Sequence, residues 1–257
     1  MSTITRQNAI NLENKQVNRS IVPTIIRWSG LAAVGAGVIF AGIQPVHPAD
    51  VVASVSTPEW AVITTLKTAM CFLFLAGIAG IYARQTSKAG WLGVAGLIIF
   101  SLSWWLQTAY VFAETFIFPV LANTAPQFVD GMLAYISNRP GDIKIDLGAL
   151  PGLYSLLGLF YMLGGMLFGV ATFRANILPR PAAGLMALTA LLTPLAALLP
   201  HQIQRFAAVP MGLAVAWLGV ALLIERRANA SENLAVTGTG SGSGSTPLTQ
   251  TAGEASN

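Results

Sequence analysis

The stretch WAVITTLKTAMCFLFLAGIAGIY, residues 60–82, decides the fold because it runs for 23 residues with a single charge, Lys67. A bilayer core of about 30 Å requires about 20 apolar residues in a helix. Peptide groups surrounded by lipid must form their hydrogen bonds within their own segment, which favours a helix. The stretch therefore predicts a membrane-spanning helix.

The rest of the chain repeats this pattern. Of 257 residues, 54% are hydrophobic and 9% are charged, against roughly 25% charged residues in soluble domains. This composition excludes an ordinary soluble enzyme and a nucleic-acid-binding protein. The sequence predicts an all-α polytopic membrane protein, a bundle of six transmembrane helices; the further runs are residues 25–46, 91–120, 150–173, 182–199 and 206–224.

Basic residues fall mainly on one side of the predicted bundle, which indicates its orientation. With the N-terminus in the cytoplasm, only Arg139, Lys144 and Arg205 lie outside, and Lys67 lies within a span. Cytoplasmic loops of membrane proteins are enriched in Lys and Arg. We therefore expect both termini to be cytoplasmic. The other ten basic residues are then on the cytoplasmic side: Arg6, Lys15, Arg19, Arg27, Arg84, Lys88, Arg174, Arg180, Arg226 and Arg227.

Aromatic residues at the ends of the runs fit this orientation. Trp28, Tyr82 and Trp91 are expected to anchor the inner interface, and Trp60 the outer one. The alternative that the first run is a cleaved signal peptide would leave five spans. Its basic region is too long for a typical signal peptide, and no clean A-x-A site follows it.

The predicted transmembrane domain, residues 23–227, lies between two polar segments. Residues 1–22 form a polar cytoplasmic segment, and residues 228–257 form a cytoplasmic tail rich in Gly, Ser and Thr. Such a tail cannot bury apolar area, so we expect it to be disordered.

One sizeable loop, residues 121–148, is expected on the outer side. Four apolar residues at helical spacing predict a short amphipathic helix within it, either as a lid over a cavity or, more simply, as a cap on the bundle. They are Phe128, Met132, Leu133 and Ile136, between Pro126 and Pro140.

Small residues are spaced for close helix packing. Gly165 with Gly169, and Gly37 with Ala41, form small-xxx-small pairs. Such pairs let helix backbones approach closely in lipid. We expect packing within the chain, with homo-oligomer formation as the alternative.

Ionisable residues at membrane depth are functional candidates by default. Lys67 lies about 10 Å inside the helix that begins at Trp60, and Glu114 lies near the outer end of the next span. An ion pair would offset part of their burial cost. The functional interpretation is an outer-leaflet cavity whose cation attracts an anionic headgroup, and Arg205 is a further candidate.

An aromatic and polar patch in the run 91–120 could face a lipid-like ligand, although bundle packing is the simpler interpretation. Its residues are Trp104, Trp105, Gln107 and Tyr110.

A metal site is a weaker hypothesis. His47, Asp50 and His201, with Glu114, could converge on a metal such as zinc at the outer face. The chain has no HExxH or comparable ligand motif. Its single cysteine, Cys71, excludes a cysteine cluster and an intramolecular disulfide. We expect no cofactor.

The segment GVATFRANILPRPAAGLMALTALL, residues 169–192, resembles a widespread type of bacterial multi-pass membrane protein. HPAD, residues 47–50, followed by a Trp-led span, adds to the likeness. The resemblance covers roughly residues 25–225. It implies a bacterial inner membrane and about six helices, and it carries no accepted activity, so no functional residue can be transferred.

These patterns favour a non-catalytic membrane protein whose partners are the bilayer and a small amphiphile or anionic lipid. A small secondary transporter is the first alternative, but the inner halves of the spans hold almost no ionisable residue. A membrane enzyme with His47, Asp50 and His201 at its outer face is the second.

Overall fold

The fold is given by a computed structural model that describes residues 24–239. Side chains of Pro140, His201, Gln202 and residues 225–239 are not described. The chain divides into two units, residues 1–223 and residues 224–257. The described part is mostly helical and contains no strand. The predicted segment 1–22 lies outside the described residues.

Four helical segments are long and apolar enough to cross a membrane. They are Thr24–Val46, Pro58–Thr124, Leu150–Ala175 and Arg205–Ile224, with the shorter apolar helix α6, Arg180–Ala196. Large apolar side chains such as Val62, Leu159 and Leu213 are exposed along them. This pattern is typical of helices that face lipid.

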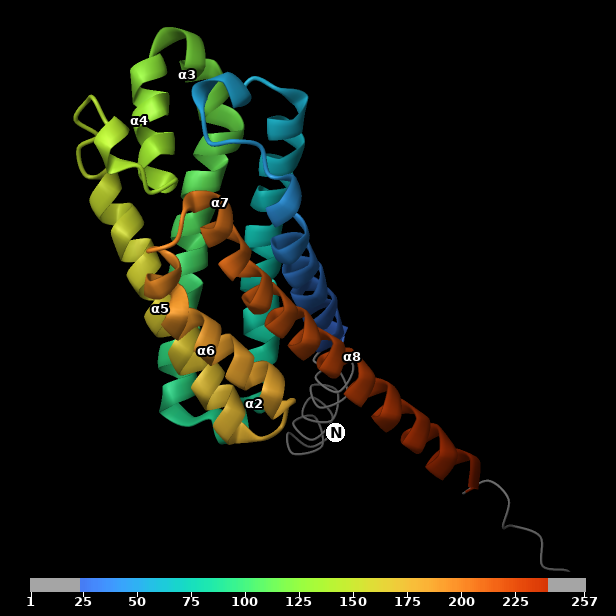
Figure 1. The fold of residues 1–257 in the computed structure, drawn as a ribbon. Helices are drawn as coiled ribbons and strands as arrows, with labels where there is room; N and C mark the ends of the chain where they lie inside the picture. Colours follow the sequence, from blue (N-terminus) through green and yellow to red (C-terminus); the bar gives the residue numbers. More distant parts are fainter. Residues whose placement is uncertain (1–23, 240–257) are drawn as a thin grey trace, which may run out of the picture. The chain divides into compact units, whose positions relative to one another are not determined.

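The segment Pro58–Thr124 is a hairpin. Helix α2, Pro58–Phe112, breaks at Gly90, where φ is 58° and ψ is −164°. A positive φ suits glycine because it lacks a Cβ. Figure 1 shows the two arms of α2 side by side and the turn between them at one end of the first unit, here called the Gly90 end. The first arm contains the predicted run 60–82, and the second arm covers residues 91–112 of the predicted run 91–120.

The second arm continues past α2 toward the opposite end, here called the α4 end. A π-helical turn, η3 (Ala113–Ile117), leads into α3, Phe118–Thr124. Helix α4, Pro126–Ile136, follows at once. The short helix expected in the loop 121–148 is therefore present, and it packs Val129, Met132 and Leu133 against the neighbouring elements.

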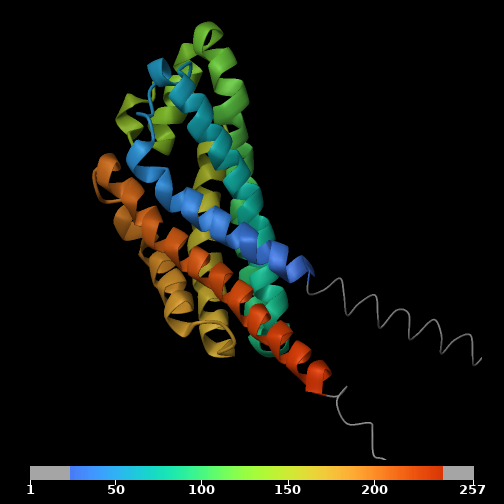
Figure 2. The same ribbon diagram turned by 90° about the vertical axis from the view of Figure 1, so that its right-hand side faces the viewer.

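The remaining elements complete an antiparallel bundle (Figures 1 and 2). Helix α5, Leu150–Ala175, returns to the Gly90 end and stops at Asn176, whose left-handed conformation terminates the helix. Helix α6 holds Pro194 in its last turn. The other elements are η1 (Gln44–Val46), η2 (Val52–Ser54), η4 (Pro140–Asp142), α7 (His201–Gln204), η5 (Arg205–Ala207) and α8 (Ala208–Thr239).

Helix α8, Ala208–Thr239, overlaps the start of the predicted tail. It extends to Thr239, past residue 228, where the predicted tail begins. Ala, Glu and Leu in this stretch are good helix formers. The rest of the tail, residues 240–257, lies outside the described residues.

Glycines bring the helices of the first unit into backbone contact. The described helix at residues 24–42 lies beside α8 (Figure 2). A Cβ added to Gly212 would lie 2.6 Å from Gly37 O, and one added to Gly219 would lie 2.7 Å from Gly30 O. A Cβ added to Gly169 would likewise lie 2.7 Å from the backbone nitrogen of Ala187 in α6. The glycines noted in the sequence thus pack within the chain.

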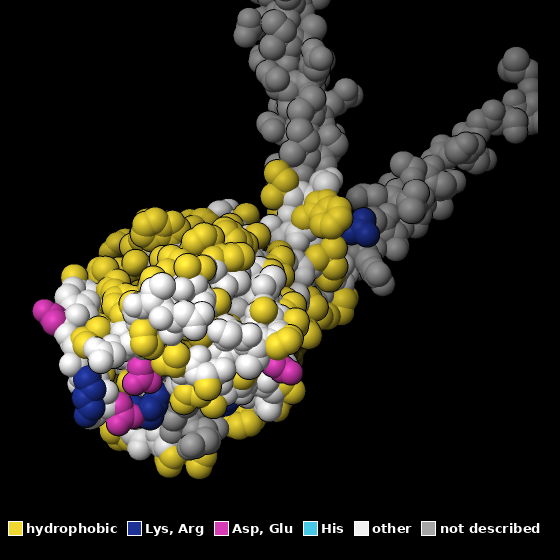
Figure 3. Space-filling model, turned by 90° about the horizontal axis from the view of Figure 1, so that it is seen from above, with side chains coloured by type: hydrophobic (Ala, Val, Ile, Leu, Met, Phe, Trp, Pro, Cys, Tyr) yellow, Lys and Arg dark blue, Asp and Glu magenta, His cyan; other side chains and the backbone are white. Residues whose placement is uncertain are grey.

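Viewed from the α4 end, hydrophobic side chains cover much of the first unit, and the charged side chains are few (Figure 3). Trp28 and Trp91, predicted to lie at the inner interface, are exposed by 67% and 80%. The burial of Trp60 contradicts the prediction that this residue anchors the outer interface. Trp60 is fully buried in an apolar cluster with Val55, Tyr110 and Phe118, and its indole N–H donates to Glu114 O at 2.9 Å across the hairpin.

The crossing of α5 with the second arm of α2 generates a prediction. A Cβ on Gly164 would lie 2.6 Å from Phe100 Cα, whereas one on Gly158 of the same helix would meet nothing within 4 Å. Gly164→Ala should lower the free energy of unfolding by about 1–3 kcal/mol through overpacking. Gly158→Ala, the control, should be neutral or stabilising by up to about 1 kcal/mol. Unfolding in mixed micelles measures both, and equal stability of the two variants would contradict this packing.

Candidate functional site

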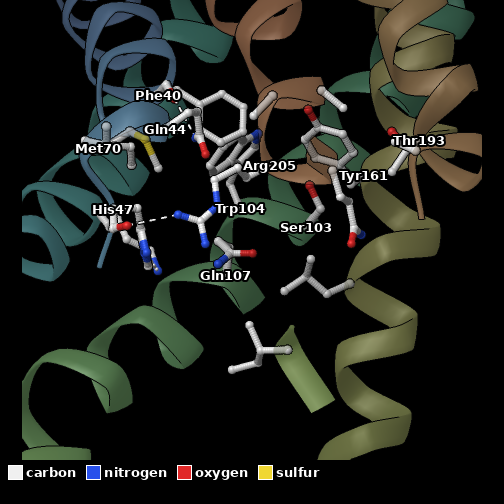
Figure 4. Close-up of a pocket in the computed structure, with 18 of the residues that line it drawn as sticks. Phe40, Gln44, His47, Met70, Ser103, Trp104, Gln107, Tyr161, Thr193 and Arg205 are labelled. Atoms are coloured by element: carbon white, nitrogen blue, oxygen red, sulfur yellow. Dashed lines mark hydrogen bonds between the residues drawn. The ribbon is translucent and has the colours of Figure 1, made fainter. Parts of the chain in front are cut away.

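A cavity of about 290 Å³ lies inside the first unit, toward the α4 end. Side chains from the described helix at residues 24–42 and from α2, α4, α5, α6 and α8 border it (Figure 4). Apolar and aromatic groups form one part of the lining. Polar groups that belong to the ends and connections of the helices form the other.

The aromatic part of the lining is built around Trp104. Phe74 stacks on its indole ring at 3.6 Å between centroids, with 10° between the ring planes. Phe40 and Tyr161 approach the same ring edge-on, at 5.5 and 6.1 Å. Interlocked rings of this kind give a wall that keeps its shape.

The polar part of the lining contains an ion pair. Lys67 Nζ donates to Glu114 Oε2, so the structure joins the two residues that the sequence singled out by depth. The Glu114 side chain is 3% exposed and that of Lys67 is 14% exposed. Lys67 borders the cavity, and Glu114 lies behind it.

The π-helical turn η3 contributes to this arrangement. It contains Glu114, which is buried, while the neighbouring Phe116 is 53% exposed. A π-turn adds a residue to one turn of the helix and is frequent at functional sites. Thr68 and Thr115 share a hydrogen bond of 3.1 Å beside the pair. The first arm of α2 and the turn η3 are therefore linked by polar contacts here.

His47 lies beside Lys67 and is neutral at pH 7. Burial, and then the Lys67 ammonium, lower the pKa of His47 to about 4. Its Nδ1 lies 2.8 Å from Pro48 O and its Nε2 lies 3.3 Å from Lys67 Nζ. One neutral tautomer satisfies both contacts, with Nδ1 donating and Nε2 accepting.

Arg205 reaches the cavity from η5. Its Nη1 donates to His47 O at 2.9 Å (Figure 4), and its Nη2 lies 3.9 Å from Asp50 Oδ2. The backbone carbonyl holds the guanidinium in place, and Asp50 forms a long ion pair with it. The carboxylate lies beyond the 2.7–2.9 Å of a charge-assisted hydrogen bond.

Hydrogen bonds join three connections above the cavity. Arg139 Nη2 donates to Asp50 O at 2.8 Å, and Asn138 Nδ2 donates to Ala197 O at 2.9 Å. With Arg205, these contacts link residues 47–50, the start of the α4–α5 loop and the α6–α7 connection. The connections that border the cavity at the α4 end are therefore held to one another by hydrogen bonds.

The aromatic and polar patch from the sequence is divided by the structure. Trp104 and Gln107 border the cavity. Trp105 points away from it and is 65% exposed. Tyr110 is buried elsewhere and donates to Leu150 O at 2.6 Å.

The proposed metal ligands are only partly described. His47 and Asp50 lie 4.0 Å apart, Nδ1 to Oδ1, and both border the cavity. The side chain of His201 lies outside the described residues. Among the side chains that are described, no group of three His, Cys, Asp or Glu residues could hold a metal ion.

Several cavity residues were not singled out from the sequence. Phe40, Gln44, Tyr154 and Tyr161 all border it. Gln44 is a buried amide at the end of an apolar run, where it donates to Phe40 O at 2.7 Å. A polar side chain at the end of an apolar run could have marked Gln44 as a cavity residue from the sequence alone. Phe40, Tyr154 and Tyr161 could not have been recognised from the sequence, because aromatic residues also occur on helix surfaces that face lipid.

The ion pair generates a prediction. Lys67→Met should destabilise the protein by about 3–5 kcal/mol, because it leaves the Glu114 carboxylate buried without a partner. The double variant Lys67→Met with Glu114→Gln should recover much of this loss. Lys144→Met, which removes an exposed lysine, is the control. Unfolding in mixed micelles provides the measurement; a Lys67→Met protein as stable as the control would refute a stabilising pair.

Comparison with known proteins identifies no relative. No family model, curated protein or solved structure matches the chain. A function must therefore be inferred from the side chains of the cavity and from the membrane setting.

Proposed function

We propose that this chain is a six-span membrane protein that binds a small amphiphile in the cavity, on the side of the membrane opposite both termini. The observation that carries the proposal is the two-part lining, aromatic around Trp104 and polar around Lys67, His47 and Arg205. Such a lining matches a molecule with an apolar body and a polar head.

The broken helix α2 supports a count of six spans. Its arms on either side of Gly90 are each longer than the roughly 20 residues that a bilayer core needs. Helix α6 has 17 residues, or about 25 Å of rise. The connection to α8 would complete that crossing, and its apolar side chains Leu198 and Ile203 are exposed by 81% and 55%.

The distribution of charge supports the orientation. Arg84 and Lys88 precede the turn at Gly90, and Arg174 and Arg180 flank the α5–α6 turn at the same end. The positive-inside rule assigns this end to the cytoplasm. The cavity would then be in the outer half of the membrane, in the localisation expected from the sequence.

The depth of the cavity fits an amphiphile. Trp104 lies 13 residues from the exposed Trp91, about 20 Å along the helix, and Glu114 lies 23 residues away, about 35 Å. With a hydrocarbon core of about 30 Å, the aromatic wall lies in the outer leaflet and the polar groups lie near its boundary. An amphiphile in the outer leaflet would have the same orientation.

The size of the cavity limits the ligand. A volume of 290 Å³ corresponds to about ten water molecules at about 30 Å³ each. It lies at the lower end of the range for ligand sites. A single short chain fits this space, and a two-chain lipid would leave most of its bulk outside.

The core beneath the cavity favours binding over transport. Phe74, Ile78, Phe100 and Phe168 are fully buried between the cavity and the Gly90 end. They belong to one apolar cluster. A transporter would need a polar path at this level.

Filling the cavity tests the proposal. Gln107→Trp places a large ring in the lining and should abolish saturable binding of radiolabelled octanoate to the full-length protein in lipid nanodiscs. Leu102→Trp, at a position on the same helix that is 41% exposed and outside the cavity lining, is the matched control and should bind as the unaltered protein does. Binding to empty nanodiscs is subtracted. Equal binding by both variants, or no saturable binding by the unaltered protein, would overturn the proposal.

A further inference from the structure

We infer that the head of the amphiphile is an oxyanion and that Arg205, rather than Lys67, receives it. This inference rests on the proposed binding cavity and names the chemistry of its ligand. It departs from the expectation in the sequence, where Lys67 was the cation assigned to an anionic headgroup.

The charge of Lys67 is already neutralised. Its ammonium donates to Glu114 Oε2 and lies 3.3 Å from His47 Nε2. Glu114 is almost completely buried, and transferring its partner to a ligand would leave that carboxylate without compensation. Lys67 is therefore a structural partner of Glu114 and a poor receptor for an incoming anion.

Arg205 differs because its carboxylate neighbour is not in hydrogen-bond contact. The distance of 3.9 Å between Arg205 Nη2 and Asp50 Oδ2 contrasts with 2.7 Å between Arg139 Nη1 and Asp142 Oδ2. The guanidinium is nevertheless fixed by its bond to His47 O. A positioned guanidinium of this kind is suited to bind a carboxylate or phosphate through two parallel hydrogen bonds.

The surroundings of Arg205 are partly apolar. Ala208, the first residue of the long helix α8, borders the cavity beside Arg205. Its backbone N–H is already bonded to Arg205 O and Phe206 O, so Ala208 adds only its small apolar side chain to the lining. The cavity lining also includes the apolar side chains of Ile43 and Leu157. An oxyanion at Arg205 would thus have room for an apolar chain directed toward Trp104.

The cavity volume restricts this ligand to a short chain. About ten water-sized groups correspond to an eight-carbon chain with a carboxylate. A carboxylate and a phosphate monoester share the required chemistry. Octanoate and octyl phosphate are therefore the probes, and octan-1-ol, of the same chain length without charge, is their neutral counterpart.

The test compares affinities for these probes in nanodiscs that contain the full-length protein. The unaltered protein should bind octanoate or octyl phosphate at least tenfold more tightly than octan-1-ol, and the tighter of the two identifies the source of the oxyanion. Arg205→Gln should reduce this preference to less than twofold. Arg205→Lys should retain part of it, because lysine keeps the charge and loses the planar fork. Arg180→Gln is the control, since Arg180 stacks on Phe173 at the Gly90 end, and it should keep the full preference.

Two outcomes would overturn the inference. One is equal affinity for octan-1-ol and both anions in the unaltered protein. The other is an unchanged preference in Arg205→Gln, judged by the ratio of affinities so that a general loss of stability does not obscure it. If all probes bind equally and Gln107→Trp abolishes that binding, the cavity function stands and the assignment of Arg205 fails. If no probe binds, both fail.

Discussion

Close contact between helix backbones is the constraint on which this structure depends. Lipid gives no hydrophobic drive for one apolar helix to leave it for another, so association requires close packing. Gly37 with Gly212, Gly164 with Phe100, and Gly169 with Ala187 provide it at three crossings. A side chain at any of these glycines would separate the helices. These contacts fix the spacing of the bundle toward the Gly90 end, where the core is dense and apolar.

The cavity forms where this close packing ends. Helix α6 stops at Ala196, and the chain passes through α7 and η5 before α8 begins at Ala208. A connection replaces a helix in the wall at this level, and polar side chains from three connections complete the lining. The buried Lys67–Glu114 pair has a different role. It links the first arm of α2 to η3. Arg205 has only the longer ion pair of 3.9 Å with Asp50, and we infer that it receives the head of the ligand.

The sequence predicted the helical fold and the Lys67–Glu114 pair because apolar length and charge depth are read directly along a chain. It could not predict which side of each helix faces inward. Trp104 and Trp105 are adjacent, yet one borders the cavity and the other faces outward, since successive residues differ by about 100° around a helix. A helix in lipid is apolar on every face, so no polar face reveals its rotation. For the same reason the sequence predicted Trp60 to be an interfacial anchor, although it is buried and donates to Glu114 O. Tyr161 was not predicted to border the cavity.

The central claim is that the hairpin at Gly90 is cytoplasmic and that the cavity lies toward the opposite side of the membrane. Single cysteines at Lys88 and at Gly141, in a chain with Cys71 replaced by alanine, test it directly in intact cells with a membrane-impermeant thiol reagent. The account predicts that the cysteine at position 141 reacts at once and that the one at position 88 reacts only after the membrane is permeabilised. Reaction at position 88 in intact cells, with position 141 protected, would contradict it.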